Sequence, residues 1–447
     1  MRKLIGIIIL GCSLGLMSVA MIHARNPVSS ADSAAPALPK DIYPESGNRF
    51  PLPNPDEMDD TGKQTYNQVV NVFHQHPSPR LYSPKLDLPL AEAGHYLKFD
   101  AGLPPRVMEI AVLVTARSFD CQYEWTQWEA HARASTDPRY IEPSIVDIVK
   151  YEKPLTGLDV NDAAIISLGR EMFIDSKVSS DTFNKVLALL GQRKTVDLVE
   201  LMGGYQACVT EMNAFDQQLE KGQTPLLPML KAHIHNPAAG AGAASTVMAT
   251  LPKEIYPDSR NRLPLPKRED MDDFGKQVFD QITKQQRLPS TADAGVRLYD
   301  PKLAKYLGDA HNYVKYETGI PDRLVEIAVL ETARARNCQY EWTQWEAHAR
   351  DANDPRHIDP AIIDMIKYDK PVLGIGEKEA AIIAFGREMF DKRKVSSETF
   401  AKVQGLFGRK GTIDLLELMT LYSADAAELT AFDQQLKPGQ KPLLPAR

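Results

Sequence analysis

The chain has only four cysteines in 447 residues, too few for a fold held together by disulfides. Cys12 lies within a candidate export signal, so cleavage would leave Cys121, Cys208 and Cys338. An odd number of cysteines in an exported chain does not form a disulfide framework. Packed hydrophobic cores must therefore supply the stability.

Long runs of basic residues are absent too, and the formal net charge is −7. Loss of Arg2 and Lys3 with a signal peptide would leave −7 − 2 = −9. An acidic chain without a basic patch is not typical of proteins that bind nucleic acid or anionic membranes. We therefore expect neither as a partner, and we expect a small-molecule substrate instead.

Period-two alternation of apolar residues, the signature of strands, is scarce, whereas helical spacing is common. This pattern predicts an all-α fold built from helical bundles. Gly191 is a candidate C-cap for one helix. In the first part of the chain we expect helices at Asp59–Phe73, Pro89–Phe99, Arg106–Arg117, Cys121–Ala134, Pro143–Tyr151, Asp159–Ile174, Ser180–Leu190 and Thr195–Leu219.

The N-terminus has the pattern of an export signal. Met1-Arg2-Lys3 is basic, an apolar run extends to Ile22, and Ser18-Val19-Ala20 or Ala24 offers a cleavage point. We expect a signal peptide at 1–24, a disordered tether at 25–35, and a periplasmic or secreted mature protein. The alternative is an uncleaved membrane anchor, because the apolar run is just long enough to span a bilayer.

The block CQYEWTQWEAHAR occurs twice, at Cys121–Arg133 and at Cys338–Arg350, a shift of 338 − 121 = 217 residues. Other segments repeat with the same or nearly the same shift. Each copy is long enough to bury its own core. We therefore expect two tandem homologous domains at 36–230 and 249–447, joined by a linker at 231–248 that is rich in small residues.

The repeated block places several reactive side chains on one face of a helix. At roughly 100° per residue, four of its positions share a stripe of roughly 80°. The stripe carries Cys121, Glu124, Trp128 and His131, and in the second copy Cys338, Glu341, Trp345 and His348. Asp120 and Asn337 are favoured N-cap residues, which would put each cysteine in the first helical turn. There the helix dipole favours the thiolate, whereas the nearby glutamate opposes it.

Glu109, with Glu326 at the same place in the second copy, lies on a strongly apolar predicted helix. A buried carboxylate is either an acid–base group or an ion-pair partner of a neighbouring arginine. A purely structural role is the alternative for all of these residues, because buried cysteines are usually inert and tryptophans usually pack in the core. Recent duplication would also explain the identity of the two blocks.

The order of these motifs resembles the carboxymuconolactone decarboxylase-like family, which includes the alkylhydroperoxidase D-like proteins. The matching segments are Arg106–Arg117, Cys121–Trp125, Gly169–Phe173 and Asp197–Phe215, and they recur at Arg323–Arg334, Cys338–Trp342, Gly386–Phe390 and Asp414–Phe432. The resemblance covers nearly all of both domains. It implies an alkylhydroperoxidase D-like helical bundle and assembly into homo-oligomers through helix packing.

The resemblance also implies roles for Glu109 and Cys121, which match the glutamate and first cysteine of the peroxidase branch. Glu124 and Glu341 stand where the second cysteine of that branch would be, so the local resolving thiol is missing. Trp128 and Trp345 stand where the decarboxylase-like branch often has a histidine. His131 and His348 lie three residues further on.

Three functions remain open. The first is a decarboxylase- or isomerase-type enzyme in which Glu109 or His131 moves a proton, Glu124 and Cys121 orient the substrate, and Tyr123, Trp128, Tyr340 and Trp345 bind it. The residue set requires no metal and no cofactor. The second is a peroxiredoxin-type peroxidase using Cys121 and Cys338. The third is a non-catalytic small-ligand-binding protein.

Overall fold

The computed structural model describes residues 38–230, 251–285 and 293–445. Within these ranges the chain is all-helical, with 62% helix and no strands, which confirms the all-α prediction. An isolated antiparallel bridge joins Tyr43 and Asn48. The predicted signal peptide (1–24), tether (25–35) and linker (231–248) lie outside the described residues. None of the described helices is long and apolar enough to span a bilayer.

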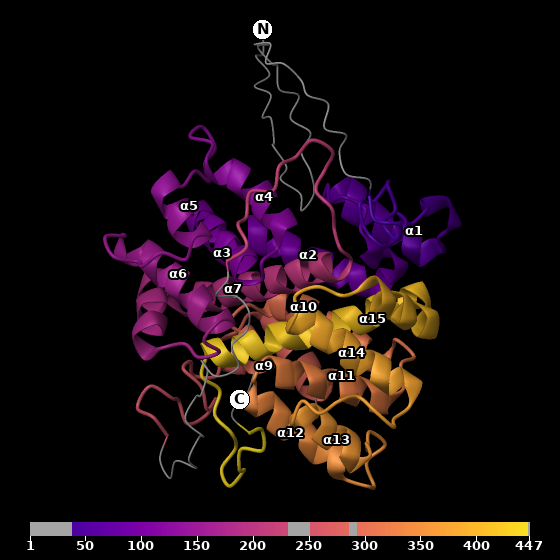
Figure 1. The fold of residues 1–447 in the computed structure, drawn as a ribbon. Helices are drawn as coiled ribbons and strands as arrows, with labels where there is room; N and C mark the ends of the chain where they lie inside the picture. Colours follow the sequence, from indigo (N-terminus) through magenta and orange to yellow (C-terminus); the bar gives the residue numbers. More distant parts are fainter. Residues whose placement is uncertain (1–37, 231–250, 286–292, 446–447) are drawn as a thin grey trace.

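The helices occur in the same order in the first half (residues 38–230) and the second half (residues 251–445) (Figure 1). The first half contains η1 (Pro55–Glu57), α1 (Asp60–Tyr66), the π turn η2 (Asn67–Val72), η3 (Pro79–Tyr82), α2 (Pro84–Phe99), α3 (Pro105–Ser118), α4 (Gln122–Ala132), α5 (Pro143–Lys150), α6 (Val160–Phe173) and α7 (Ser180–Ala214). The second half contains η5 (Arg268–Asp270), α8 (Asp273–Gln285), α9 (Asp293–Arg297), α10 (Pro301–Tyr316), α11 (Asp322–Ala335), α12 (Gln339–Arg350), α13 (Pro360–Lys367), α14 (Glu377–Phe390) and α15 (Ser397–Ala431).

Local sequence signals explain where these helices begin and end. Pro84 and Pro105 occupy first turns, where the missing N–H has no helical partner to lose. Gly191 has φ 74° and interrupts α7, so a helix does end there as predicted, although a second helical segment continues directly from it. That segment ends at Ala214 and not at Leu219.

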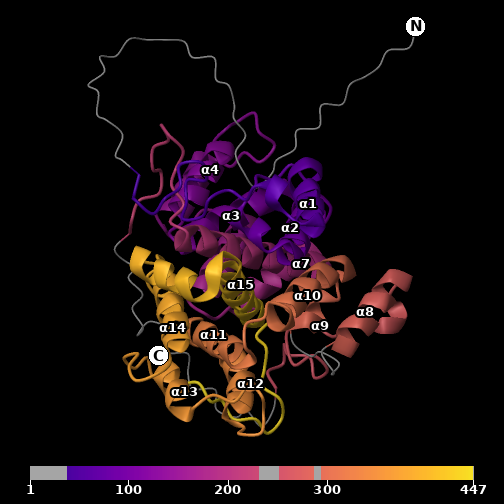
Figure 2. The ribbon, with the colours of Figure 1, turned by 90° about the vertical axis from the view of Figure 1, so that its right-hand side faces the viewer.

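The long helices α7 and α15 lie side by side at the centre of the molecule, and α2 packs against α10 (Figures 1 and 2). The remaining helices of each half pack on the outer sides of this pair. Helix α3 is the most deeply buried of the first half, since every residue from Glu109 to Ser118 is buried. One hydrophobic core lies mainly in each half, and each core includes residues from the other half.

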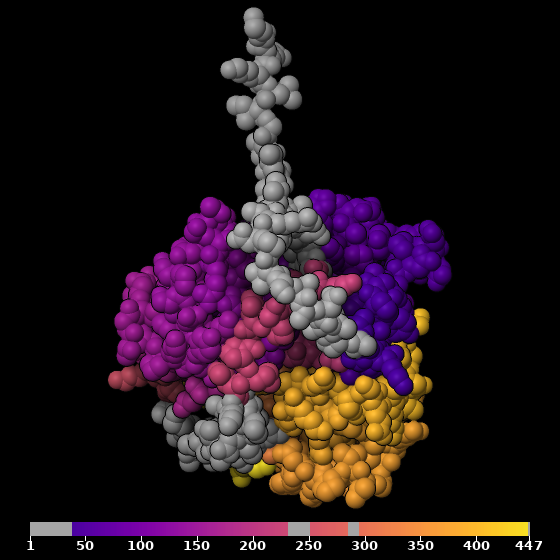
Figure 3. All heavy atoms as spheres, turned by 45° about the horizontal axis from the view of Figure 1, so that its top comes forward, coloured from indigo at the N-terminus to yellow at the C-terminus, as the bar shows by residue number. Residues whose placement is uncertain are grey.

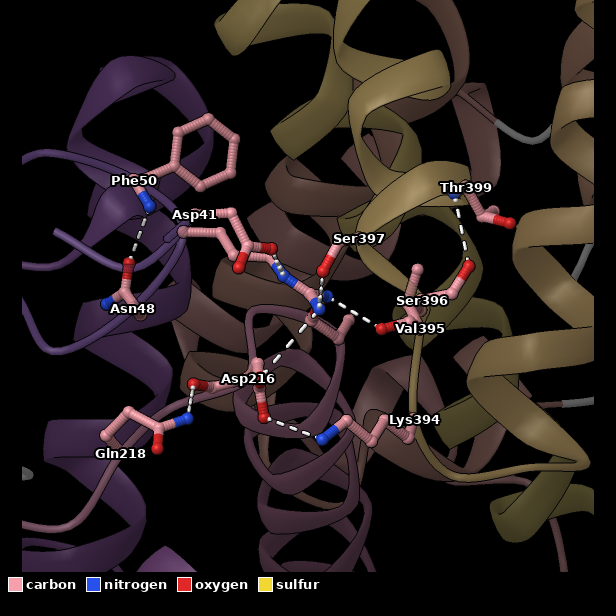
Figure 4. Close-up of polar contacts among 12 residues, drawn as sticks. Asp41, Asn48, Phe50, Asp216, Gln218, Lys394, Val395, Ser396, Ser397 and Thr399 are labelled. Carbon is pink, nitrogen blue, oxygen red and sulfur yellow. Dashed lines mark hydrogen bonds and ion pairs between the residues drawn. The ribbon is translucent and has the colours of Figure 1, made fainter. Parts of the chain in front are cut away.

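The segment before α1 joins the first half to the second. The guanidinium of Arg49, which is buried, donates to the carbonyl of Ala214 (2.9 Å) and to that of Val395 (2.8 Å). Figure 4 shows Val395 and Lys394 close to Asp216, with Lys394 Nζ 3.2 Å from its carboxylate. In the space-filling view, indigo atoms of the first half accordingly lie against gold atoms of the second half (Figure 3).

Arg262 of the second half makes the equivalent contact with the first half. Its guanidinium donates to the carbonyl of Ala431 (3.0 Å) in its own half and to that of Val178 (2.8 Å) in the first half. These two carbonyls correspond to those of Ala214 and Val395, since 431 − 214 = 217 and 395 − 178 = 217. Each half therefore holds the other through one buried arginine.

Candidate active site

Glu109 is the most unusual side chain of the candidate site. It projects from α3, is 0% exposed, and neither of its carboxylate oxygens has a hydrogen-bond partner among the described residues. Burial raises the pKa of Glu109 to about 8; Arg139 opposes the shift, and Asp137 and Glu124 add to it. A buried carboxyl with this pKa is poised to exchange a proton near neutral pH.

Glu124 is the second carboxyl of the site and comes from α4. It is 3% exposed, and burial raises its pKa to about 7, although the Lys98 ammonium and a hydrogen bond from the Trp128 indole lower it. Because the charge of Glu124 contributes to the raised pKa of Glu109, the two carboxyls lie near each other. The structure thus brings together Glu109, Glu124 and Trp128, three of the residues that the sequence analysis named.

Three further residues line this site, and the sequence reasoning missed them. The Trp128 ring meets the Tyr205 ring edge-on (α7; 5.5 Å between centroids, 88°), and the Lys98 ammonium (α2) lies 5.6 Å from the Tyr205 ring. The Arg139 guanidinium, in the loop after α4, lies 5.9 Å from the Trp128 ring. The available signal was repetition: Lys98, Arg139 and Tyr205 recur 217 residues later as Lys315, Arg356 and Tyr422.

The second half repeats the arrangement. Burial raises the pKa of Glu326 to about 8, and Arg356 and Lys315 lower it. Trp345 meets Tyr422 edge-on (5.1 Å, 89°), and the Lys315 ammonium lies 5.0 Å from the Trp345 ring. Glu341, from α12, is 4% exposed.

The cysteines do not sit where we predicted. Cys121 and Cys338 are themselves the N-caps of α4 and α12, so neither lies inside the first turn. Asp120 (φ 52°) and Asn337 (φ 51°) adopt the left-handed conformation that ends the preceding helix, which short polar side chains tolerate. Burial raises the pKa of the Cys121 thiol to about 12, so the thiol stays protonated.

Both histidines lie at the far end of the stripe from the cysteines. Cys121 and His131 are ten positions apart, which is roughly 15 Å along a helix at 1.5 Å per residue. His131 is half-buried with its Nδ1 3.8 Å from Asp137, and burial lowers its pKa; burial also lowers the pKa of His348. A common face therefore did not bring Cys121 and His131 to one reaction centre.

The predicted substrate-binding tyrosines lie on the cysteine side of α4 and α12. Tyr123 and Cys121 line an open groove of about 900 Å³ between the ends of α4 and α7 and the end of α14. Tyr340 packs against Cys338 and Leu429. Trp128 and Trp345, by contrast, lie against the buried carboxyls.

Much of the repeated block is structural. The buried carboxylate of Glu129 accepts from the Trp125 indole (2.6 Å), from Arg133 (2.7 Å) and from Lys150 of α5 (2.9 Å). Glu346 of the second block accepts from the corresponding tryptophan, arginine and lysine. Packing and ion pairing therefore explain these residues without catalysis.

Among the residues that the structure describes, no group of three or more His, Cys, Asp or Glu side chains could hold a metal ion. The chain matches no family model, no curated protein and no solved structure.

Proposed function

We propose that the chain is an exported enzyme with two tandem homologous domains of the carboxymuconolactone decarboxylase-like type, and that it moves protons on a small carbonyl compound. The observation that carries this proposal is the buried pair Glu109 and Glu124, whose pKa values lie at about 8 and about 7. The sequence resemblance and the repeated helix order support the family and the tandem arrangement.

The two carboxyls supply an acid and a base at the same pH. With both pKa values raised into the neutral range, one carboxyl of the pair is ionised and can take a proton from the carbon next to a carbonyl, while the other is protonated and can donate one. The Lys98 ammonium lies on the same side as Glu124 and stabilises negative charge there. Trp128 and Tyr205 form the aromatic wall against which a substrate packs.

Proton transfer is favoured over the peroxidase alternative because of the state of the thiols. A peroxidase needs a thiolate as nucleophile. Burial raises the pKa of Cys121 to about 12 and that of Cys338 well above its usual value. With Glu124 and Glu341 at the position of the second cysteine, a local resolving thiol is missing as well.

Deuterium exchange tests the proposal with simple carbonyl compounds in place of the physiological substrate. Small keto acids, ketones and lactones are incubated with the protein in D₂O, and exchange at the carbon next to the carbonyl is followed by NMR. We expect catalysed exchange of at least one compound, lost by at least 100-fold in E109Q/E326Q, since general acid–base groups typically contribute that much. The matched control E45Q/E269Q changes two exposed glutamates and should keep full activity. Full activity of E109Q/E326Q would reject the assignment.

A further inference from the structure

A second feature of the molecule is a cavity of about 80 Å³ between α2 and α7 of the first half and α10 and α15 of the second. Every second-half residue that lines it is matched by a first-half residue 217 positions earlier, as in Arg80 with Arg297 and Leu90 with Leu307. The reverse does not hold. Leu97, Lys98 and Tyr205 also line the cavity, whereas their counterparts do not. The cavity therefore extends from the junction of the halves into the first half.

Two glycines of the first half leave this space open. Gly94 and Gly204 both line the cavity, and their counterparts 217 residues later are His311 and Leu421. A Cβ added at Gly94 or Gly204 would meet no heavy atom within 4 Å, so packing does not require glycine at either place.

The neighbouring Gly203 differs, because a Cβ there would lie 3.3 Å from that of Ala424 on α15. Glycine inside a helix is destabilising relative to alanine. Glycine at 94 and 204 therefore keeps the cavity open at a cost in helix stability.

The polar groups of the cavity define what it can hold. Its arginines are already matched: Arg80 pairs with Asp87 (3.1 Å), and Arg297 pairs with Glu200 (2.7 Å) and Asp425 (2.8 Å). A charged ligand would find no uncompensated opposite charge at either arginine. The remaining walls are mostly leucine, alanine and glycine.

Two polar atoms of lining residues have no hydrogen-bond partner among the described residues: the hydroxyl of Tyr205, which is 4% exposed, and Oε1 of Glu417, which is 2% exposed. Burial and the neighbouring Glu211 raise the pKa of Glu417 well above its usual value, so this carboxyl adds no charge to the cavity wall. Burial and the nearby Glu124 raise the pKa of Tyr205 well above its usual value, so the hydroxyl keeps its proton and acts as a donor. A buried donor without a partner is costly, and a ligand that offers an acceptor removes this cost.

We propose that this cavity binds a small uncharged molecule with an apolar body and one carbonyl oxygen, which accepts a hydrogen bond from Tyr205. An engineered cavity of about 150 Å³ holds benzene, so about 80 Å³ suits a ligand of roughly three to five heavy atoms, or the end of a longer one. Both halves line this site, and its extension toward Leu97, Lys98 and Tyr205 lies in the first half. The cavity shares Lys98 and Tyr205 with the candidate active site, so the inference deepens the proposed function and rests on it for the carbonyl class of ligand. Xenon and acetone binding are measured without turnover, so a failure of this site can be told apart from a failure of proton transfer.

The test uses two probes on the full chain. Xenon, detected by xenon NMR, reports the open volume, and acetone, detected by saturation-transfer NMR, reports the hydrogen bond. We expect wild type to bind both, and G94H/G204L, which carries the second-half residues, to bind neither. The control G405L changes an exposed glycine of α15 that also has open space at its Cβ, and it should bind both.

Y205F separates the two parts of the proposal. It should keep xenon binding and weaken acetone binding by about 5- to 10-fold, the usual effect of losing one hydrogen bond. Absence of binding in wild type, or undiminished binding in folded G94H/G204L, would overturn the site. Unchanged acetone binding in Y205F would overturn the hydrogen bond. If G94H/G204L fails to fold, the binding of xenon and acetone to wild type and to Y205F still tests the proposal.

Discussion

Gln206 of α7 donates a hydrogen bond from its Nε2 to the hydroxyl of Ser423 on α15, and the two residues occupy equivalent positions, since 423 − 206 = 217. A residue that contacts its own counterpart marks the point about which two equivalent halves are arranged. The reciprocal bonds of Arg49 and Arg262 obey the same relationship. The two halves thus contact each other as the subunits of a symmetric dimer do.

Cutting the chain between the halves should therefore leave them together. A protease site inserted between residues 231 and 250 would be cleaved in the purified protein, and the two fragments should co-elute in size-exclusion chromatography. The packing of α7 against α15 is independent of the connection. Separate elution of the fragments at micromolar concentration would show that the connection, and not the packing, holds the halves together.

Arg49 and Arg262 should contribute more to the free energy of unfolding than residues in surface ion pairs do. R49A leaves the carbonyls of Ala214 and Val395 without this donor, and we expect a loss of about 3 kcal/mol in the free energy of unfolding. R262A should cause a similar loss in the free energy of unfolding. The control R268A removes a solvent-exposed pair with Asp280 and should cost far less than either of these changes. Denaturant unfolding gives all three values, and equal losses would contradict the prediction.

His311 should be an imidazolium in the folded protein. Its Nδ1 lies 2.8 Å from the carbonyl of Leu307 and its Nε2 lies 2.8 Å from the carboxylate of Asp425, so both ring nitrogens face acceptors. Burial opposes the charge, but Asp425 raises the pKa of His311. Burial also opposes ionisation of Asp425, yet His311 and Arg297 lower its pKa to about 2.

The sign of the pH dependence follows. Because the pKa of His311 is higher in the folded protein than in the unfolded protein, the charged ring stabilises the fold fully below its unfolded pKa of about 6.5. This stabilisation is lost as the pH rises through the pKa of the folded protein. The difference in unfolding free energy between wild type and H311Q should therefore shrink from pH 6 to pH 9. A difference that is constant or grows over this range would show a neutral ring.

Cys121 and Cys338 should resist modification while the protein is folded. Both thiols are buried, with raised pKa values, so iodoacetamide should label them at least 100-fold more slowly than in urea-unfolded protein. Mass spectrometry of the labelled peptides gives both rates. Rapid labelling of folded protein, or sulfenic acid formation with peroxide, would restore the peroxidase alternative.

Much of the fold could be predicted from the sequence because its signals are local. The apolar run of α3, its opening proline and the glycine that interrupts α7 all depend on nearby residues. The candidate site was predicted in part. Glu109, Glu124 and Trp128 do come together, but His131 does not join Cys121, because a common helical face says nothing about distance along the axis. Lys98 and Tyr205 reach the site from α2 and α7, and no spacing within one segment could reveal that.

The protonation state of Glu109 and Glu326 tests the central claim most directly. Infrared difference spectroscopy between wild type and E109Q/E326Q, recorded from pH 6 to pH 10, isolates the signal of these two carboxyls. We predict a protonated carboxyl band in wild type at pH 7 that is lost as pH rises past about 8, because burial holds both pKa values there. An ionised carboxylate signal throughout, with no band lost near pH 8, would contradict the account.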